Sequence, residues 1–326
     1  LSELHEKQIW AIARIVVMSD SSEINVHPEW YITRKSYKAV PAACSTKRYL
    51  VKPPPDGKKP NIVFWQDKAG RYWIDPANKE GRNHIFEFSK KMIDLGFDEL
   101  QYDYIRFPSD GDIQNAIYPA WDGKTSKCTV MRDYFRFLAS NLKAHKPDII
   151  LSADLFGYAS IGLDTGIGQC VESLENNFDY VSFMVYPSHY YSGFLMPQDP
   201  YRNLPPLNYT VAQSRAHPDD IVGRSMLFAR DFFDGKISTS TYPFSYITAP
   251  VSTSTPPIEP VFVPRSKIRL RPWLEDFFHE ADAAAGRPAG AEKARLEIDA
   301  AEKTADGGWL LWNAGNVYSE DALKKE

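Results

Sequence analysis

Asp103 and Asp154 each end a segment that predicts a β-strand, and each is followed by loop-forming residues. Neighbouring parallel strands lie about 4.8 Å apart, so carboxylates at adjacent strand ends would face each other across a short gap. Such a pair can act as a nucleophile and a general acid/base. In glycosidic bond cleavage, separations of about 5–5.5 Å accompany retention and about 6.5–9.5 Å inversion, so adjacent strand ends favour retention.

The alternative for both aspartates is a structural cap on the turn or helix that follows the strand. Asp103 precedes Tyr-Ile-Arg-Phe, which does not begin a helix, so a cap is the weaker interpretation there. Asp154 precedes Leu-Phe-Gly, and both interpretations stay open. We expect Asp103 to be the nucleophile and Asp154 the general acid/base.

Two polar residues accompany Asp103. Gln101 shares its face of the alternating strand, and Arg106 follows in the loop. Arg106 could keep a carboxylate ionised or bind an acidic sugar. The equally open alternative is a structural ion pair with Asp98 or Asp110.

Later strand ends carry further candidates for sugar binding. Tyr186 offers a hydroxyl donor, and His189 is a loop histidine that could titrate near neutrality or simply form surface hydrogen bonds. An arginine, a tryptophan and an acid share one face of the fifth strand. The last strand ends in a tryptophan that is either a platform under a sugar ring or a buried core residue. These residues are Arg271, Trp273, Glu275, Trp312 and Asn313, with Glu275 and Asp276 as alternative acids.

Six strand-like segments and the helical patterns between them must position these side chains. The strand-like segments are 9–18, 96–103, 148–155, 178–187, 267–274 and 308–313, and helical patterns cover 1–7, 85–95, 131–145 and 291–304. Alternating strands and helices predict an α/β fold with a parallel sheet. Polar strand ends favour a (β/α)₈ TIM-type barrel with its site at one rim. A doubly wound sheet is the alternative, but no glycine-rich nucleotide turn follows a strand.

A closed barrel needs eight strands, so these six are expected to be strands 3–8, with the N-terminal two absent from the chain. We predict a single domain over 1–326. Loop insertions are expected at about 36–60 and 237–264, because these segments are rich in proline and in lysine or hydroxyl residues.

Composition narrows the class of partner. A formal net charge of −4 without a basic stripe argues against nucleic acid, and no apolar run is long enough to span a membrane. An aromatic share of 13% supports a carbohydrate ligand. No metal or other cofactor is expected, since no ligand spacing occurs. The oligomeric state stays open.

The cysteines do not settle the compartment. Cys44, Cys128 and Cys170 match neither a disulfide framework nor a metal site, although one disulfide with one free thiol stays possible. We favour an extracytoplasmic location, periplasmic or secreted, over a cytoplasmic one.

With these residues in view, the chain resembles a family of bacterial (β/α)₈ barrels described as glycosyl hydrolase domains, distantly related to the α-amylase-like barrels. The resemblance rests on ordered motifs that begin at Trp10, Gly96, Leu151, Met184, Leu270 and Gly308. It implies glycoside hydrolysis, with Asp103 and Asp154 at the ends of the fourth and fifth strands.

The sequence departs from the amylase pattern at two positions. Gln101 replaces the arginine two residues before the nucleophile, and the acid is Asp154 rather than glutamate. A chitinase-type catalytic glutamate would fall at Ile105, which argues against that mechanism. The alternative function is an inactive barrel that binds polysaccharide or a protein partner.

Overall fold

The computed structural model describes residues 1–34, 63–240, 243–248 and 261–323. It divides into two compact units, Leu1–Leu151 with Thr165–Gln169 (unit one) and Ser152–Asp164 with Cys170–Glu326 (unit two). The predicted insertion at 36–60 lies outside the described residues. The one at 237–264 lies partly outside, and its described ends include the antiparallel pair β10 (Ile237–Ser238) and β11 (Ser245–Tyr246).

Unit one is built on two parallel strands, β1 (Ile12–Val16) and β4 (Glu99–Asp103). Their register aligns Arg14 with Gln101 and Val16 with Asp103. Because alternate residues share a face, Arg14, Gln101 and Asp103 lie on the same side of this pair. Ala13, Ile15, Leu100 and Tyr102 occupy the other side and are buried.

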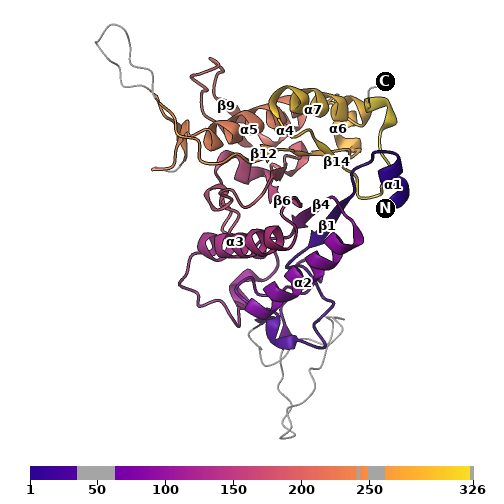
Figure 1. Ribbon diagram of the computed structural model, residues 1–326. Coiled ribbons are helices and arrows are strands. Elements are labelled where there is room, and N and C mark those ends of the chain that lie inside the picture. Colours follow the sequence, from indigo (N-terminus) through magenta and orange to yellow (C-terminus); the bar gives the residue numbers. More distant parts are fainter. Residues whose placement is uncertain (35–62, 241–242, 249–260, 324–326) are drawn as a thin grey trace, which may run out of the picture. The chain divides into compact units, whose positions relative to one another are not determined.

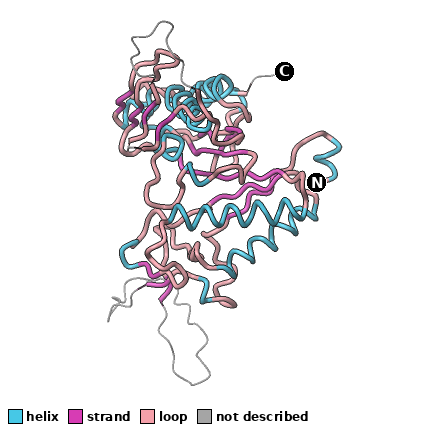
Figure 2. Tube along the Cα trace, turned by 60° about the vertical axis from the view of Figure 1, so that its left-hand side comes forward, coloured by secondary structure: helices cyan, strands magenta, loops and turns pink. Residues whose placement is uncertain are grey.

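The long helices α2 (Lys79–Leu95) and α3 (Lys127–His145) lie side by side in unit one (Figures 1 and 2). Asn78 caps the start of α2 by accepting a hydrogen bond from the Gly81 N–H at 2.8 Å. Gly96 ends the helix with φ +100°, as the sequence predicts. The hydroxyl of Tyr102 donates to Ser89 at 2.9 Å, which fixes β4 against α2.

The remaining elements of unit one are short. Helix α1 precedes β1, and the antiparallel order β3-β2-β5 forms a separate small sheet. Their bounds are α1 Ser2–Glu6, η1 Pro28–Trp30, β2 Thr33–Arg34, β3 Val63–Phe64, η2 Ile113–Asn115 and β5 Ala116–Ile117.

Unit two carries parallel strands in the order β6, β7, β13, β14, and β12 also pairs with β7. The single strand predicted for 267–274 is wrong, because two short strands replace it. Pro272 lacks an N–H group and cannot continue the ladder, so the chain breaks there. The bounds are β6 Ile150–Phe156, whose first two residues belong to unit one, β7 Tyr180–Met184, β12 Arg269–Leu270, β13 Trp273–Glu275 and β14 Leu310–Trp312.

Helices α5 (Pro218–Phe233) and α7 (Ala291–Thr304) pack against each other in unit two (Figure 1). Gly223 of α5 faces Ala300 and Thr304 of α7 at this contact. The shorter elements are η3 Gly157–Ile161, η4 Val171–Ser173, η5 Pro187–His189, β8 Phe194–Met196, β9 Leu207–Tyr209, α4 Val211–Ala216, α6 Glu280–Ala284 and η6 Glu320–Ala322.

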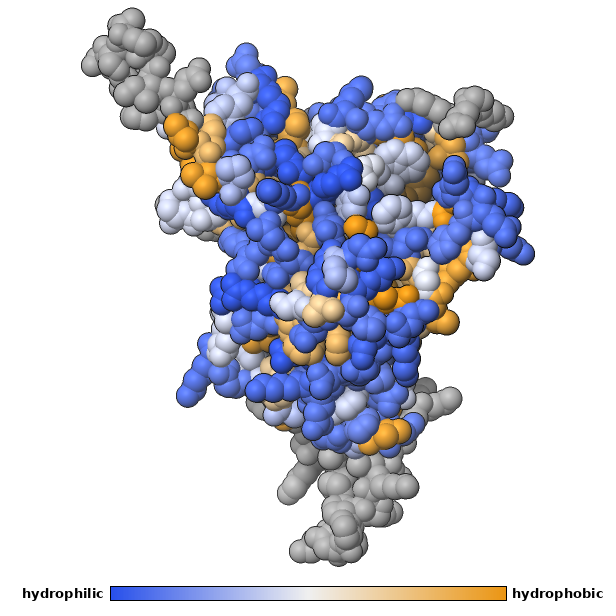
Figure 3. Space-filling view, viewed as in Figure 1, coloured by the Kyte–Doolittle hydropathy of each residue, from blue (hydrophilic) through white to orange (hydrophobic). Residues whose placement is uncertain are grey.

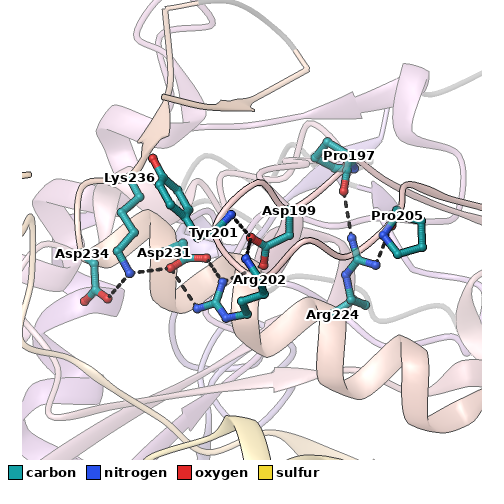
Figure 4. A network of polar contacts seen from close by, with 9 residues as sticks. All are labelled: Pro197, Asp199, Tyr201, Arg202, Pro205, Arg224, Asp231, Asp234 and Lys236. Carbon is teal, nitrogen blue, oxygen red and sulfur yellow. Dashed lines mark hydrogen bonds and ion pairs between the residues drawn. The ribbon is translucent and has the colours of Figure 1, made fainter. Parts of the chain in front are cut away.

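A buried ion-pair network holds the loop after β8 to α5 (Figure 4). Arg202 contacts Asp199 at 2.6 Å and Asp231 at 2.5 Å, and both carboxylates are fully buried. Lys236 approaches Asp231 at 2.9 Å and Asp234 at 3.4 Å. Every one of these carboxylates has a cationic partner, so we assign the network to stability rather than to catalysis.

Parallel strands with packed helices confirm the predicted α/β class. The helical segments 1–7, 85–95, 131–145 and 291–304 all correspond to helices, although α2 and α3 begin earlier than predicted. Within the described residues, no helix is long and apolar enough to cross a membrane. The face in Figure 3 is mostly hydrophilic, with hydrophobic residues in small separate groups.

Candidate active site

Asp103 is the last residue of β4 and is only 6% exposed. Its carboxylate forms an ion pair with Arg14 from the neighbouring strand β1. It also accepts a hydrogen bond from the N–H of Tyr104 at 2.6 Å. A guanidinium and a backbone donor therefore hold this carboxylate in place and stabilise its negative charge.

The backbone directly after Asp103 adopts a conformation that is rare for a residue with a side chain. Tyr104 has φ +53°, in the left-handed region. Two backbone hydrogen bonds from the segment after β1 hold this turn. The Val17 N–H donates to the Asp103 carbonyl at 2.9 Å, and the Met18 N–H donates to the Tyr104 carbonyl at 3.2 Å. Such strain concentrates at functional sites, where the surrounding structure maintains it.

The ring of Tyr104 lies between two arginines. The guanidinium carbon of Arg71 is 4.7 Å from the ring centroid and that of Arg106 is 5.2 Å away. Arg71 also donates to the Tyr104 hydroxyl at 2.8 Å and pairs with Asp67 at 2.9 Å. Arg106 lies 5.0 Å from the Trp73 ring as well.

Arg106 is 6% exposed and donates to the carbonyl of Phe107 at 3.0 Å. Burial lowers the pKa of its guanidinium to about 10, and the Asp103 carboxylate opposes that shift. The group is therefore still charged at neutral pH. Of the two acids considered as its structural partners, Asp110 also opposes the pKa shift of Arg106, and it accepts a hydrogen bond from the Lys68 N–H at 3.1 Å. Asp98 accepts one from the Ala11 N–H at 2.7 Å.

Arg14 contacts the Asp103 carboxylate but was not among the residues predicted from the sequence. It lies opposite Gln101 in the register of β1 and β4, so a neighbouring strand supplies a guanidinium beside Asp103. The available signal was a single arginine inside the otherwise apolar run Ile12–Val16. Gln101 itself is 2% exposed.

Asp154 lies in β6 of unit two and is 1% exposed. The indole N–H of Trp273 on β13 donates to its carboxylate at 2.8 Å. The Trp273 ring also packs edge-on against Trp312 on β14, with centroids 6.1 Å apart. Strands β6, β13 and β14 thus bring one acid and two tryptophans together in this unit.

Arg271 is nearly buried, and its guanidinium carbon lies 4.3 Å from the Tyr180 ring centroid. Asn313 uses its amide within the loop after β14. Its Nδ2 donates to the Asp276 carbonyl at 2.6 Å, and its Oδ1 accepts from the Gly315 N–H at 2.8 Å. Asn313 therefore shapes the loop.

Glu275 ends β13 but is fully buried. Its carboxylate pairs with Lys293 of α7, accepts from the Ser188 hydroxyl at 2.5 Å, and lies 3.9 Å from the His279 ring nitrogen. The backbone N–H of Glu275 donates to Glu297 at 2.9 Å. Burial raises the pKa of Glu297 well above its ordinary value, with Lys293 opposing.

Tyr186 and His189 follow β7, and their rings lie 5.1 Å apart. Tyr186 is 5% exposed, whereas His189 reaches the surface. Burial lowers the pKa of His189, and His279 and Lys293 act in the same direction. At neutral pH His189 is therefore an uncharged ring.

The predicted residues fall into two groups. Gln101, Asp103 and Arg106 lie together in unit one, and the other predicted residues lie in unit two. Cys128 and Cys170 are both disulfide-bonded, so neither offers a free thiol. Cys44 lies outside the described residues.

Parallel strands and packed helices define an α/β protein that places Asp103 at the end of β4 in unit one and, in unit two, Asp154 beside Trp273. Residues 1–318 match the model of the family described as "Putative glycosyl hydrolase domain". The chain belongs to this family, which confirms the resemblance seen in its sequence motifs. No curated protein matches the chain.

Several solved structures are similar to the chain at low identity. The first, a hypothetical protein from Ruminiclostridium thermocellum ATCC 27405, is 24% identical with a TM-score of 0.34, and the match covers 47% of this chain and 62% of that one. The PgaB (BpsB) glycoside hydrolase domain from Bordetella bronchiseptica is 11% identical, with a TM-score of 0.46 and coverages of 95% and 72%. Eubacterium rectale Amy13B is 12% identical with a TM-score of 0.46, and the match covers 96% of this chain and 50% of that one. The chain thus spans less than two thirds of the first of these proteins.

Proposed function

We propose that this chain is a retaining glycosidase that cleaves O-glycosidic bonds in a polysaccharide or oligosaccharide. The observation that carries the proposal is the Asp103 carboxylate. It ends a parallel strand, carries an arginine partner and precedes a strained turn. A nucleophile needs a carboxylate that is held in a fixed position, and Arg14 and the Tyr104 N–H hold this one.

In the proposed mechanism, the Asp103 carboxylate attacks the anomeric carbon and forms a covalent glycosyl ester. Asp154 gives its proton to the departing glycosidic oxygen, which leaves as an alcohol. In the second step Asp154 takes a proton from water, the water oxygen attacks the anomeric carbon, and the ester bond to Asp103 breaks. The Trp273 indole N–H, at 2.8 Å, orients the Asp154 carboxyl for both transfers.

The remaining residues divide into sugar-binding and supporting groups. Trp273 and Trp312 offer ring surfaces, and Gln101, Arg106, Arg271, Tyr186 and His189 offer hydrogen-bond donors. We assign Glu275 to support, because its carboxylate is fully buried between Lys293 and Ser188. Asn313 supports its loop in the same way.

The alternative is a barrel that binds polysaccharide without cleaving it. The observation that favours it is the 1% exposure of Asp154, whose contact with Trp273 would equally suit a structural carboxylate. This alternative predicts glycan binding that Asp103→Asn leaves intact, with no turnover of any glycan.

The test is release of reducing ends from a panel of polysaccharides by the parent chain, Asp103→Asn and Asp103→Gly. We expect Asp103→Asn to lose at least about 10³-fold in kcat/KM. For Asp103→Gly we expect azide to restore turnover as a glycosyl azide, because azide replaces the missing nucleophile. Full activity of Asp103→Asn on a substrate that the parent cleaves would refute the assignment. The separation of the two carboxyl groups, measured in a crystal of the sugar complex, should be about 5–5.5 Å.

A further inference from the structure

Aromatic rings gather at the C-terminal ends of β7 and β13 in unit two. We call Tyr186, His189, Tyr191, Phe277 and His279 the aromatic platform. His189 contacts Tyr186 at 5.1 Å, Tyr191 at 5.7 Å and Phe277 at 6.0 Å between ring centroids. Phe277 also lies 5.5 Å from Tyr186 and 6.1 Å from His279. The rings therefore form one continuous group contributed by two loops.

The platform is partly open to solvent. Tyr191 is 74% exposed, and Phe277 is half-buried. Tyr186 is 5% exposed and lies among the rings. Exposed aromatic groups of this kind mark interaction sites more often than single exposed hydrophobic residues do.

Buried polar contacts fix the two loops that carry these rings. Ser188, next to His189, donates from both its hydroxyl, at 2.5 Å, and its N–H, at 3.3 Å, to the Glu275 carboxylate. Asp276 accepts from the Ser319 N–H and hydroxyl at 2.6 and 2.7 Å. The exposed rings are thus held before any ligand arrives, which lowers the entropy cost of binding.

The platform carries no formal charge at neutral pH. Burial lowers the pKa of His189, with His279 and Lys293 acting in the same direction. Burial also lowers the pKa of His279, with Arg215 acting likewise. The platform therefore offers apolar ring faces, with imidazole nitrogens and tyrosine hydroxyls at their edges.

We propose that the aromatic platform is a binding subsite for a neutral hexopyranosyl chain, with Tyr191 and Phe277 as its stacking residues. Pyranose rings present an apolar C–H face and hydroxyl edges, which complement aromatic faces and polar ring edges respectively. The inference rests on the proposed function, because it assigns the substrate class of that site.

The test measures binding rather than turnover, by calorimetry on the full chain carrying Asp103→Asn. The probes are the neutral cellohexaose, maltohexaose and chitohexaose, and the acidic hexagalacturonate. Tyr191→Ala and Phe277→Ala each remove a stacking ring, whereas Tyr191→Phe keeps the ring and removes only the hydroxyl. Trp10→Ala is the matched control, since Trp10 is a 53% exposed aromatic residue that precedes β1. Circular dichroism checks that each variant is folded.

We expect at least one neutral hexasaccharide to bind more tightly than hexagalacturonate. Each alanine variant should weaken that binding at least about tenfold, while Tyr191→Phe and Trp10→Ala change it less than about twofold. Unchanged binding in folded alanine variants, preference for hexagalacturonate, or no binding of any probe would each overturn the inference. Continued hydrolysis by Asp103→Asn would refute the nucleophile instead and leave the binding result standing.

Discussion

Arg14 on β1 pairs with the carboxylate of Asp103 at the end of the neighbouring strand β4. The arginine lies opposite Gln101 in the register of the two strands. The guanidinium beside the Asp103 carboxylate is therefore supplied by the neighbouring strand. In the proposed mechanism Arg14 acts through Asp103, which makes it a positioning residue.

The first prediction concerns this pair. Arg14→Met should lower kcat/KM about 100-fold, because the carboxylate loses the guanidinium that holds it in place. Arg14→Lys should restore part of the loss, since it keeps a cation at this position. Steady-state kinetics of the parent and both variants give the answer. The control is Arg34→Met, which removes the surface pair with Asp112; equal effects in both variants would contradict the role of Arg14.

The second prediction concerns the backbone of Tyr104. At φ +53° a glycine is tolerated better than an alanine, so Tyr104→Gly should be about 1 kcal/mol more stable to urea than Tyr104→Ala. Both variants lose the ring, and their difference therefore isolates the backbone. Lys91 lies inside α2, so there the glycine variant Lys91→Gly should be less stable to urea than Lys91→Ala. The same order at both positions would mean that the turn at Tyr104 is not strained.

The third prediction concerns pH. Burial raises the pKa of Glu297, so the folded state binds its proton more tightly than the unfolded state does. The stability linked to this proton is fully present below the ordinary pKa of a glutamate and is lost as pH rises toward the folded value. The unfolding free energy of Glu297→Gln minus that of the parent should therefore be larger at pH 8 than at pH 5. Urea unfolding of the parent and Glu297→Gln at pH 5 and pH 8 tests this, with Asp299→Asn, at a partly exposed carboxylate, as the control. The same difference in unfolding free energy between Glu297→Gln and the parent at both pH values would refute the prediction.

The fourth prediction concerns the network in Figure 4. Arg202→Met leaves the buried carboxylates of Asp199 and Asp231 without a shared guanidinium and should cost about 3 kcal/mol of unfolding free energy. Lys90→Met, which removes the exposed pair with Glu87, should cost less than about 1 kcal/mol. The catalytic parameters of both variants should match those of the parent. A large loss of activity in folded Arg202→Met would show that the network is more than structural.

Periodicity was enough to predict the α/β class and the strand that ends at Asp103, because hydrophobic alternation and helix-ending glycines are local signals. The break at Pro272 was missed because the residues around it still suit a strand. Arg14 was missed for a different reason. Its role comes from the pairing register of β1 and β4, which joins residues 89 positions apart and leaves no local pattern.

The burial of Glu275 could not be predicted from the strand face that it shares with Arg271 and Trp273. The alternation predicts which side of the strand a residue is on, but not that Lys293 and Ser188 close over the carboxylate. Asn313 is a similar case, because its partners are backbone groups of its own and a neighbouring loop.

The two backbone hydrogen bonds from Val17 and Met18 to the turn at Asp103 have a consequence for how this chain can diversify. The proposed nucleophile, its cationic partner and the groups that hold its backbone all belong to unit one, whereas the proposed acid/base Asp154 and the aromatic platform belong to unit two. Under the two proposals, substitutions at Tyr191 or Phe277 would alter which glycan is bound while the contacts of Asp103 stay as they are. The support of the nucleophile and the platform are encoded in separate stretches of sequence, so one can vary while the other is preserved.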